Sequence, residues 1–283
     1  MERNEPKTYR EMAEEELRQA HIVTCAGVRE YIQGAQRRGE EIARLLASRM
    51  SLEGKRALDV GTGDGGVAVA LSRWKCFTVA FDNSWDNVVR ARQLAREASV
   101  TPSFLVMDAE HAGLAPDRLD MVILADVLEH VADPDKVVSV LADSMKRGAL
   151  CYVSVPNAFA PWNIIREQHY HLFGLSLMPQ RLAKSYVTRV RKRSTIYAVR
   201  SKFSWRSLRK LFAAHGIALE LCGEFRSISR LEHPEQLIDP VQRSIATFLS
   251  VLRLRPVVKA LFRVKLYQRW FAPGLVCIGR KIE

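Results

Sequence analysis

Between Gly54 and Pro156, short apolar runs alternate with amphipathic segments, and this pattern constrains the fold more than any other feature of the chain. The apolar runs are continuous rather than alternating, as in strands that are buried on both faces of a parallel sheet. We expect strands at 56–60, 77–81, 103–107, 121–125 and 150–155, with helices at 66–74, 84–98 and 134–146. Strand–helix alternation predicts an α/β fold with helices on both faces of the sheet.

Less regular segments flank this core. Residues 8–50 predict two or three helices, with joints at Gly27 and Gly34. Further elements are expected as a cap over 157–203, a helix at 204–215, strands at 217–225 and 275–279, and basic, largely helical sequence over 241–271 that is interrupted at Pro256. We therefore divide the chain into a helical segment (1–50), a core (51–160), a cap insertion (161–204) and a C-terminal part (205–283) with a basic helical insertion at 226–274.

The composition is that of a globular domain. The chain has 283 residues, 48% of them hydrophobic and 26% charged, so it can bury a large core without a metal or a disulfide. Its five cysteines are far apart and include no C-x-x-C pair, which favours reduced thiols in a reducing compartment. The charged start does not resemble a signal peptide, and no apolar stretch approaches the ~18 residues of a membrane span. We expect a cytoplasmic protein.

The positive charge is concentrated in the C-terminal part. The formal net charge is +12, yet residues 1–167 sum to −4. Residues 168–219 hold 11 Lys and Arg and no acid, and residues 241–283 sum to +8. Such asymmetry indicates an anionic partner, and peripheral contact with an anionic membrane surface is one candidate. Val257, Val258, Leu261 and Phe262 recur at helical spacing within the basic region, a stripe that we expect to pack onto the edge of the sheet, the alternative being an interfacial helix.

A glycine-rich loop follows the first expected strand and opens the first expected helix. Gly61, Gly63 and Gly66 let backbone N–H groups approach a ligand at a helix N-terminus. The spacing G-x-G-x-x-G also fits dinucleotide-binding proteins, and alone it is weak. Asp59, two residues before the first glycine, would repel a pyrophosphate but suits a cationic amine or sulfonium.

Two further acids end neighbouring strands. Asp82 follows Gly61 by 21 residues, where a carboxylate can accept hydrogen bonds from ribose hydroxyls. Asp108 ends the third strand and can accept from an adenine amino group. Together with Asp59 they are expected to line the crevice at the carboxyl ends of the strands.

At these residues the chain resembles the class I S-adenosylmethionine-dependent methyltransferases, in particular the group that contains ubiquinone-biosynthesis and other small-molecule methylases. The resemblance is carried by LDVGTGDGG, VAFDNS, MDAEH, DMVILADVLEHVADP and ALCYVSVPN, in order over about residues 50–160. It implies a Rossmann-like, doubly wound, seven-stranded, mostly parallel sheet whose last strand, 275–279, is antiparallel. The 168–182 region is similar to an insertion in bacterial methylases attributed to cell-surface glycan and lipid pathways.

The resemblance also implies S-adenosylmethionine as methyl donor and S-adenosylhomocysteine as product. Gly61 and Gly63 would pack against the methionine part, Asp82 would hold the ribose, and Asp108 and Ala109 the adenine. The residues expected to contact the donor are Asp59, Gly61, Thr62, Gly63, Asp82, Asn83, Asp108, Ala109, Ala125 and Asp126, of which the last two would lie beside the amine and the sulfonium.

Three histidines are candidates for a general base. His130 follows the fourth strand, and His169 and His171 lie in the expected cap, where they would face the same side of an extended segment. A sugar hydroxyl needs such a base more than a phenol does, because its pKa is higher. We take His169 as the first choice. A metal site is not expected, because His169-x-His171 has no third ligand in register.

The sequence thus predicts a methyltransferase that acts on a hydroxyl of a small molecule, a glycan or a lipid-linked precursor. The alternatives are a methyltransferase-like nucleoside-binding or scaffold protein without turnover, and an RNA-directed methyltransferase, which the basic run 189–193 keeps open. Nucleic acid is the less favoured acceptor, because the D/N-P-P-Y/F signature is absent after the fourth strand. The oligomeric state is not predicted.

Overall fold

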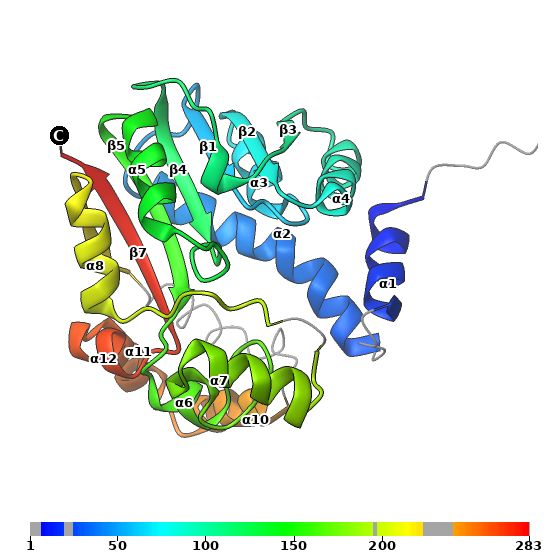
Figure 1. Ribbon diagram of the computed structural model, residues 1–283, viewed down its shortest axis with the longest axis vertical. Helices are drawn as coiled ribbons and strands as arrows, with labels where there is room; N and C mark the ends of the chain where they lie inside the picture. The colour runs from blue at the N-terminus through cyan, green and yellow to red at the C-terminus, as the bar shows by residue number, and fades with distance from the viewer. Residues whose placement is uncertain (1–6, 20–24, 195–196, 223–239, 283) are drawn as a thin grey trace, which may run out of the picture.

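A seven-stranded sheet forms the centre of the molecule (Figure 1). The computed structural model describes residues 7–19, 25–194, 197–222 and 240–282. In spatial order the strands are β3 (Ser103–Val106), β2 (Phe77–Asp82), β1 (Arg56–Val60), β4 (Leu119–Ala125), β5 (Met145–Pro156), β7 (Gly274–Lys281) and β6 (Ile217–Leu221). Strands β1 to β5 are parallel to one another, and β7 is antiparallel to both β5 and β6. The predicted α/β sheet with an antiparallel last strand is confirmed.

Helices cover both faces of the sheet, because successive residues of a strand point to opposite sides. Along β4, Val122 and Leu124 join one buried cluster, which also contains side chains of α5 (Pro134–Ser144) and α8 (Trp205–Ala214). Met121 and Ile123 join another, built with α2 (Cys25–Ala47) and α3 (Gly66–Arg73). The continuous apolar strands are therefore explained by burial on both faces.

Local sequence signals set where the helices begin. In α4 (Trp85–Glu97), the side chain of Ser84 accepts a hydrogen bond from the backbone of Asn87. In α5, Asp133 accepts from the backbone of Lys136, and Pro134 occupies the first turn. Between β4 and α5, residues 128–130 form a turn.

The N-terminal segment consists of two helices, α1 (Tyr9–Gln19) and α2. The predicted joints at Gly27 and Gly34 are wrong, because both glycines lie inside α2. A third glycine, Gly39, packs against Gly66 at the start of α3, where a Cβ on Gly66 would overlap the carbonyl oxygen of Ala35. The glycines thus permit a close helix crossing rather than a bend, which brings α2 against the glycine loop.

The cap contains α6 (Pro161–Ile165), η2 (Leu175–Leu177), α7 (Gln180–Ser185) and a π-helical turn η3 (Tyr186–Val190). It has a small apolar core of its own, formed by Leu172, Leu175, Ala183, Val187, Tyr197 and Val199. The chain then returns to the sheet, where the backbone N–H groups of Arg200 and Ser201 donate to the carbonyl oxygen of Glu129.

The C-terminal part forms α10 (Pro240–Val251), α11 (Arg255–Arg263) and α12 (Lys265–Trp270) before β7. The predicted interruption is present, with Arg253 at φ 56° just before α11 and Pro256 in its first turn. Of the four residues expected to pack onto the sheet, Val257 and Leu261 are 65% and 49% exposed, so the prediction is wrong for them, whereas Val258 and Phe262 are half-buried. Residues 223–225 of the expected sixth strand and 226–239 of the basic insertion lie outside the described residues.

Two expectations from composition can be compared with the described part of the chain. Cys76, Cys151, Cys222 and Cys277 are buried. Among the described residues, none of the helices combines the length and the hydropathy that crossing a bilayer requires.

Candidate active site

A cavity of about 390 Å³ opens at the carboxyl ends of β1 and β4. Its walls are the glycine loop, the N-terminal helix α2 and the end of β4. Six of the ten residues expected to contact the donor line this cavity: Asp59, Gly61, Thr62, Gly63, Ala125 and Asp126. The structure therefore brings these residues together at one cavity, and their contact with a donor stays a prediction.

The glycine loop has the conformation that its sequence requires. Gly61 and Gly63 adopt φ 63° and 54°, which side chains rarely tolerate. A Cβ on Gly61 would lie 2.7 Å from Cγ2 of Val127, so the loop also packs against the turn after β4. The N–H of Gly63 donates to Oδ2 of Asp82 at 2.9 Å, which ties the loop to the end of β2.

Asp59 is a buried carboxylate at the bottom of the cavity. It is 1% exposed, and it accepts a hydrogen bond of 2.6 Å from the Thr62 hydroxyl. Burial raises its pKa to about 7, although the Thr62 hydrogen bond and the charge of Arg38 act in the opposite direction. A cation bound in the cavity would stabilise the ionised form.

Arg38 of α2 forms the opposite wall, and sequence reasoning missed it. Its Nη2 atom lies 2.6 Å from Oδ2 of Asp126 and 3.1 Å from Oγ of Ser154, and Ser154 also donates to Asp126 at 2.8 Å. Asp126 has φ 59°, so the backbone turns sharply where β4 ends. No motif marks Arg38, because it stands in a polar helical stretch and meets the site only through the α2–α3 crossing.

The remaining acids lie at the same edge of the sheet but outside the cavity lining. Asp82 ends β2 and is buried, accepting hydrogen bonds from the backbone N–H of Ser84 and the side chain of Asn87. Asn83 beside it is exposed. Asp108 follows β3, exposed, and caps the short helix η1 (Ala109–His111). The acids thus lie at the carboxyl ends of three adjacent strands, but of the three only Asp59 lines the cavity.

A buried network anchors the loop to α4 and to α1. Asp64 of the loop accepts from Nε of Arg90 at 2.8 Å and from the Tyr9 hydroxyl at 2.9 Å, and all three residues are buried. Arg90 also pairs with Glu16 of α1 at 2.9 Å. This network fixes the outer side of the glycine loop. The only sequence signal for the network was Arg90, a charged residue on the apolar face of α4.

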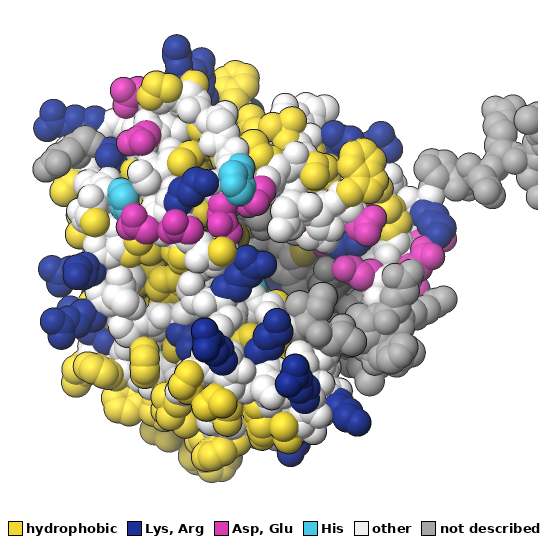
Figure 2. Space-filling view, in the orientation of Figure 1, with side chains coloured by type: hydrophobic (Ala, Val, Ile, Leu, Met, Phe, Trp, Pro, Cys, Tyr) yellow, Lys and Arg dark blue, Asp and Glu magenta, His cyan; other side chains and the backbone are white. Residues whose placement is uncertain are grey.

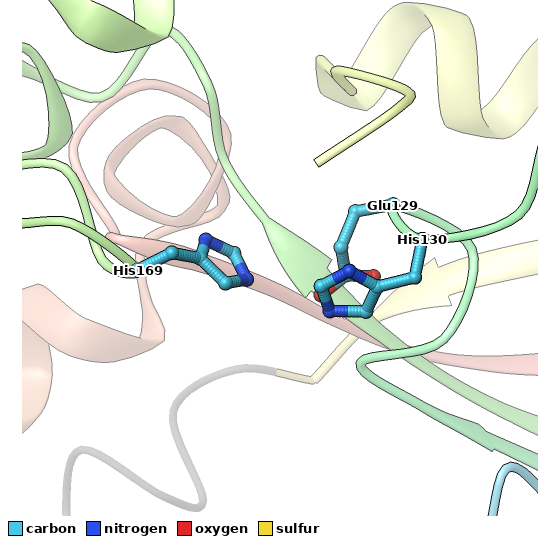
Figure 3. A group of neighbouring side chains, drawn as sticks. All are labelled: Glu129, His130 and His169. Atoms are coloured by element: carbon cyan, nitrogen blue, oxygen red, sulfur yellow. The ribbon is translucent and has the colours of Figure 1, made fainter. Parts of the chain in front are cut away.

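A second cluster lies next to the cavity, between the turn after β4 and the cap. Figure 3 shows the rings of His130 and His169 directed toward one another, with the carboxyl group of Glu129 beside them. The ring centroids are 5.2 Å apart, at an interplanar angle of 88°. Nδ1 of His130 lies 3.1 Å from the carbonyl oxygen of Ala198. Burial lowers the pKa of His130, which keeps its ring neutral near pH 7.

Glu129 is the most unusual group of this cluster. It is 1% exposed, and among the described residues neither carboxyl oxygen has a hydrogen-bond partner. Burial and the charge of Asp126 raise its pKa to about 8. The sequence analysis passed over Glu129 because it stands between an apolar residue and the histidine that drew attention. One ligand-forming atom of Glu129, one of His130 and one of His169 all lie within 4.8 Å of one another. The sequence spacing His169-x-His171 did not indicate this grouping, because Glu129 and His130 are distant in the sequence.

Glu167 orients His169. Its Oε1 lies 2.7 Å from Nδ1 of His169, while its Oε2 accepts from the backbone N–H groups of His169 and Tyr170. Burial raises the pKa of Glu167, but these hydrogen bonds outweigh it and hold the pKa below its ordinary value. An ionised Glu167 keeps the proton of His169 on Nδ1 and leaves Nε2 as an acceptor.

The third histidine is not part of this cluster. We expected His169 and His171 to face the same side because we expected an extended segment. Residues 168–170 instead form a turn, so that expectation is wrong. His171 is exposed and has φ 57°.

A family model described as a methyltransferase domain matches residues 7–221, about three quarters of the chain. The chain therefore belongs to the methyltransferase family, within the class I S-adenosylmethionine-dependent group that its sheet and motifs define. The methyl donor of that family is S-adenosylmethionine.

Curated relatives and solved structures agree with this family. The chain is 28% identical over 159 residues to a ubiquinone biosynthesis O-methyltransferase of Agrobacterium fabrum, covering 52% of this chain and 64% of that protein. It is 34% identical over 120 residues to the enzyme of the same name from Xanthomonas campestris, covering 41% and 50%. The chain thus spans about half to two thirds of the length of these relatives. An S-adenosylmethionine-dependent methyltransferase from Mesorhizobium loti shares the fold, with TM-score 0.54, 14% identity, and coverage of 85% and 97%.

Proposed function

We propose that the protein transfers a methyl group from S-adenosylmethionine to a hydroxyl of a small molecule, a glycan or a lipid-linked precursor. The observation that carries this proposal is the juxtaposition of two sites along one turn. Asp126 lines the cavity of the glycine loop, and Glu129 and His130, three and four residues later, meet His169 of the cap. A donor and an acceptor can therefore be held side by side. The O-methyltransferase names of the relatives agree with a hydroxyl acceptor.

The charges of the cavity support a position for the donor. Its ammonium group would face Asp59, whose burial without a cation is costly, and its methionine chain would lie along Gly61 and Gly63. Asp82 would accept from the ribose hydroxyls, since its carboxylate has lone pairs beyond those used by the loop. Asp108 and Ala109 would bind the adenine. The sulfonium would then lie near Ala125 and Asp126.

The chemistry is an in-line displacement. The acceptor oxygen forms a bond to the methyl carbon while the carbon–sulfur bond breaks, and its electron pair stays on sulfur, giving S-adenosylhomocysteine. The hydroxyl proton moves to Nε2 of His169, which the Glu167 carboxylate leaves free as an acceptor. The resulting imidazolium is stabilised by the same carboxylate at 2.7 Å. His130 is neutral and contributes a second polar wall.

The acceptor site is closed in this conformation. A cavity of about 30 Å³ between Glu129, His169, Tyr197 and Lys202 has space for about one or two waters but not for an acceptor. An acceptor must therefore displace part of the cap. Excluding water in this way suits a reaction between a sulfonium and a hydroxyl.

The formation of S-adenosylhomocysteine tests the proposal. S-adenosylhomocysteine formation is measured with phenolic and sugar-alcohol acceptors for the wild type and for His169→Ala, Glu167→Gln and His215→Ala. We expect His169→Ala to lower kcat about 10²- to 10⁴-fold with unchanged donor affinity, and Glu167→Gln to shift the pH profile. His215, which pairs with Asp135 away from both cavities, is the matched control. Donor binding without product from any acceptor would instead favour a nucleoside-binding protein without turnover, and turnover of RNA alone would favour the RNA-directed alternative.

A divalent cation is the second candidate occupant of the cluster. The observation that favours it is the Glu129 carboxylate, whose oxygens have no hydrogen-bond partner among the described residues, although Oε1 lies 3.9 Å from Nε2 of His130, and which is within reach of both histidines. A cation would orient the acceptor hydroxyl and lower the pKa of that hydroxyl. It would also bind the lone pair of His169 Nε2, which could then no longer act as the base. Titration of the chelated protein with Zn²⁺ or Mg²⁺ separates the two. Stoichiometric binding that Glu129→Gln abolishes would assign a cation site, whereas full activity in chelator would assign the base.

A further inference from the structure

The helix α11 has a row of apolar side chains that the protein does not cover. Leu254, Val257, Leu261 and Val264 follow one another at spacings of three and four residues, so they share one side of the helix. They are 40%, 65%, 49% and 46% exposed, and α11 contains no buried residue. We call these four residues the α11 face.

Neighbouring elements extend the α11 face. Trp270 and Phe271 at the end of α12 are 59% and 53% exposed, and Phe248 of α10 is 61% exposed. The cap is fastened beside them, because Asn163 and Gln168 donate to the carbonyl oxygen of Pro273. Its exposed apolar side chains are Phe159, Trp162, Ile165, Phe173, Leu177, Leu182 and Val190. Figure 2 shows hydrophobic side chains gathered over the bottom of the molecule, where Figure 1 places α6, α7 and α10 to α12.

Cations surround this apolar region. Lys259, Arg263 and Arg269 stand on α11 and α12, and Arg181 and Lys184 stand on α7. In Figure 2 a band of Lys and Arg side chains lies directly above the hydrophobic area. The described residues 168–194, 197–219 and 240–282 contain no Asp or Glu. The region therefore combines exposed apolar side chains with a strong excess of positive charge, and the exposed acid Glu220 of β6 lies 3.8 Å from Lys265 at its edge.

We propose that the α11 face docks onto an anionic lipid bilayer, with α11 lying in the plane of the interface. Apolar side chains enter the acyl boundary, while Lys and Arg on the flanks remain at the level of the anionic headgroups. Tryptophan, here Trp162 and Trp270, is a residue that favours this depth. Two other occupants fit less well. A second copy would set cations against cations, and RNA would gain nothing from Val257 and Leu261 at the centre of the surface.

Vesicle flotation tests the docking without donor or acceptor, so its result does not depend on the proposed methyl transfer. The probes are vesicles of phosphatidylcholine alone and of phosphatidylcholine with about 30% phosphatidylglycerol, since anionic headgroups supply the attraction. We expect binding only to the anionic vesicles and release at high salt. Each cation removed, as in Arg263→Gln or Arg269→Gln, should weaken binding about fivefold.

The apolar part of the contact is tested by the double variant Val257→Glu/Leu261→Glu, which should lower vesicle binding at least tenfold. Phe77→Glu is the matched control, because Phe77 is 70% exposed at the start of β2, away from these helices. Unchanged S-adenosylhomocysteine binding in each variant shows that it is folded. The proposal is overturned by equal, negligible binding to both vesicles, by a double variant that binds like the wild type, or by a dimer in sedimentation that the double variant dissociates.

Discussion

The buried carboxyl group of Asp59 should make donor binding depend on pH in a calculable way. Its pKa in the free protein is about 7, and a donor ammonium group requires the ionised form. Below the pKa a proton must therefore leave before the donor binds, so affinity falls as pH falls. With a pKa of about 7, the ionised fraction is about one half at pH 7 and about one tenth at pH 6, which predicts about fivefold weaker binding at pH 6.

Calorimetry with S-adenosylhomocysteine measures both the affinity and the proton. In two buffers of different ionisation enthalpy, the titrations should show about half a proton released at pH 7 and about 0.9 at pH 6. The donor's own amine stays largely protonated in this window, because α-amino groups titrate near pH 8. Asp59→Asn should bind more weakly and lose the pH dependence. An affinity that is flat between pH 6 and 7 in the wild type would refute the assignment of Asp59 to the ammonium group.

Three further variants probe the walls of the site. Asp82→Ala should weaken S-adenosylhomocysteine binding at least tenfold in calorimetry, since it loses charge-assisted hydrogen bonds of about 1.5–3 kcal/mol each; unchanged affinity would remove the ribose assignment. Arg38→Ala removes the ion pair between Arg38 and Asp126 and should weaken S-adenosylhomocysteine binding at least tenfold. Unchanged affinity would show that this ion pair is only structural. Gly66→Ala should lower the free energy of unfolding by about 1–3 kcal/mol in denaturant titration, because α2 must move; Gly113→Ala, with open space around it, is the control, and equal stability of the two would contradict the close crossing.

The sheet could be predicted because its sequence signals are local. Continuous apolar strands, a Ser or Asp at a helix start and a glycine loop each act over a few residues, and they fix which edge carries Asp59, Asp82 and Asp108. The antiparallel last strand was expected only through the resemblance to a family, since residues 275–279 alone do not specify an orientation.

The missed residues depend on contacts between distant segments. Arg38 lies 88 positions before Asp126 and meets it only because α2 crosses α3 at two glycines. Glu129 and His169 are brought together by the fold of the cap, which no periodicity specifies. The α11 stripe was assigned to the core because an amphipathic pattern indicates which residues share a face but does not identify what covers that face.

One piece of backbone serves both cavities. The carbonyl oxygen of Glu129 accepts from Arg200 and Ser201 of the returning cap segment, and the same turn begins at Asp126 against Arg38. If this segment lifts to admit an acceptor, it must either break two hydrogen bonds or pull the Asp126 turn with it. In the second case, the turn would couple the two cavities. Donor binding would then change how readily the acceptor enters, and so set the order in which the two substrates bind.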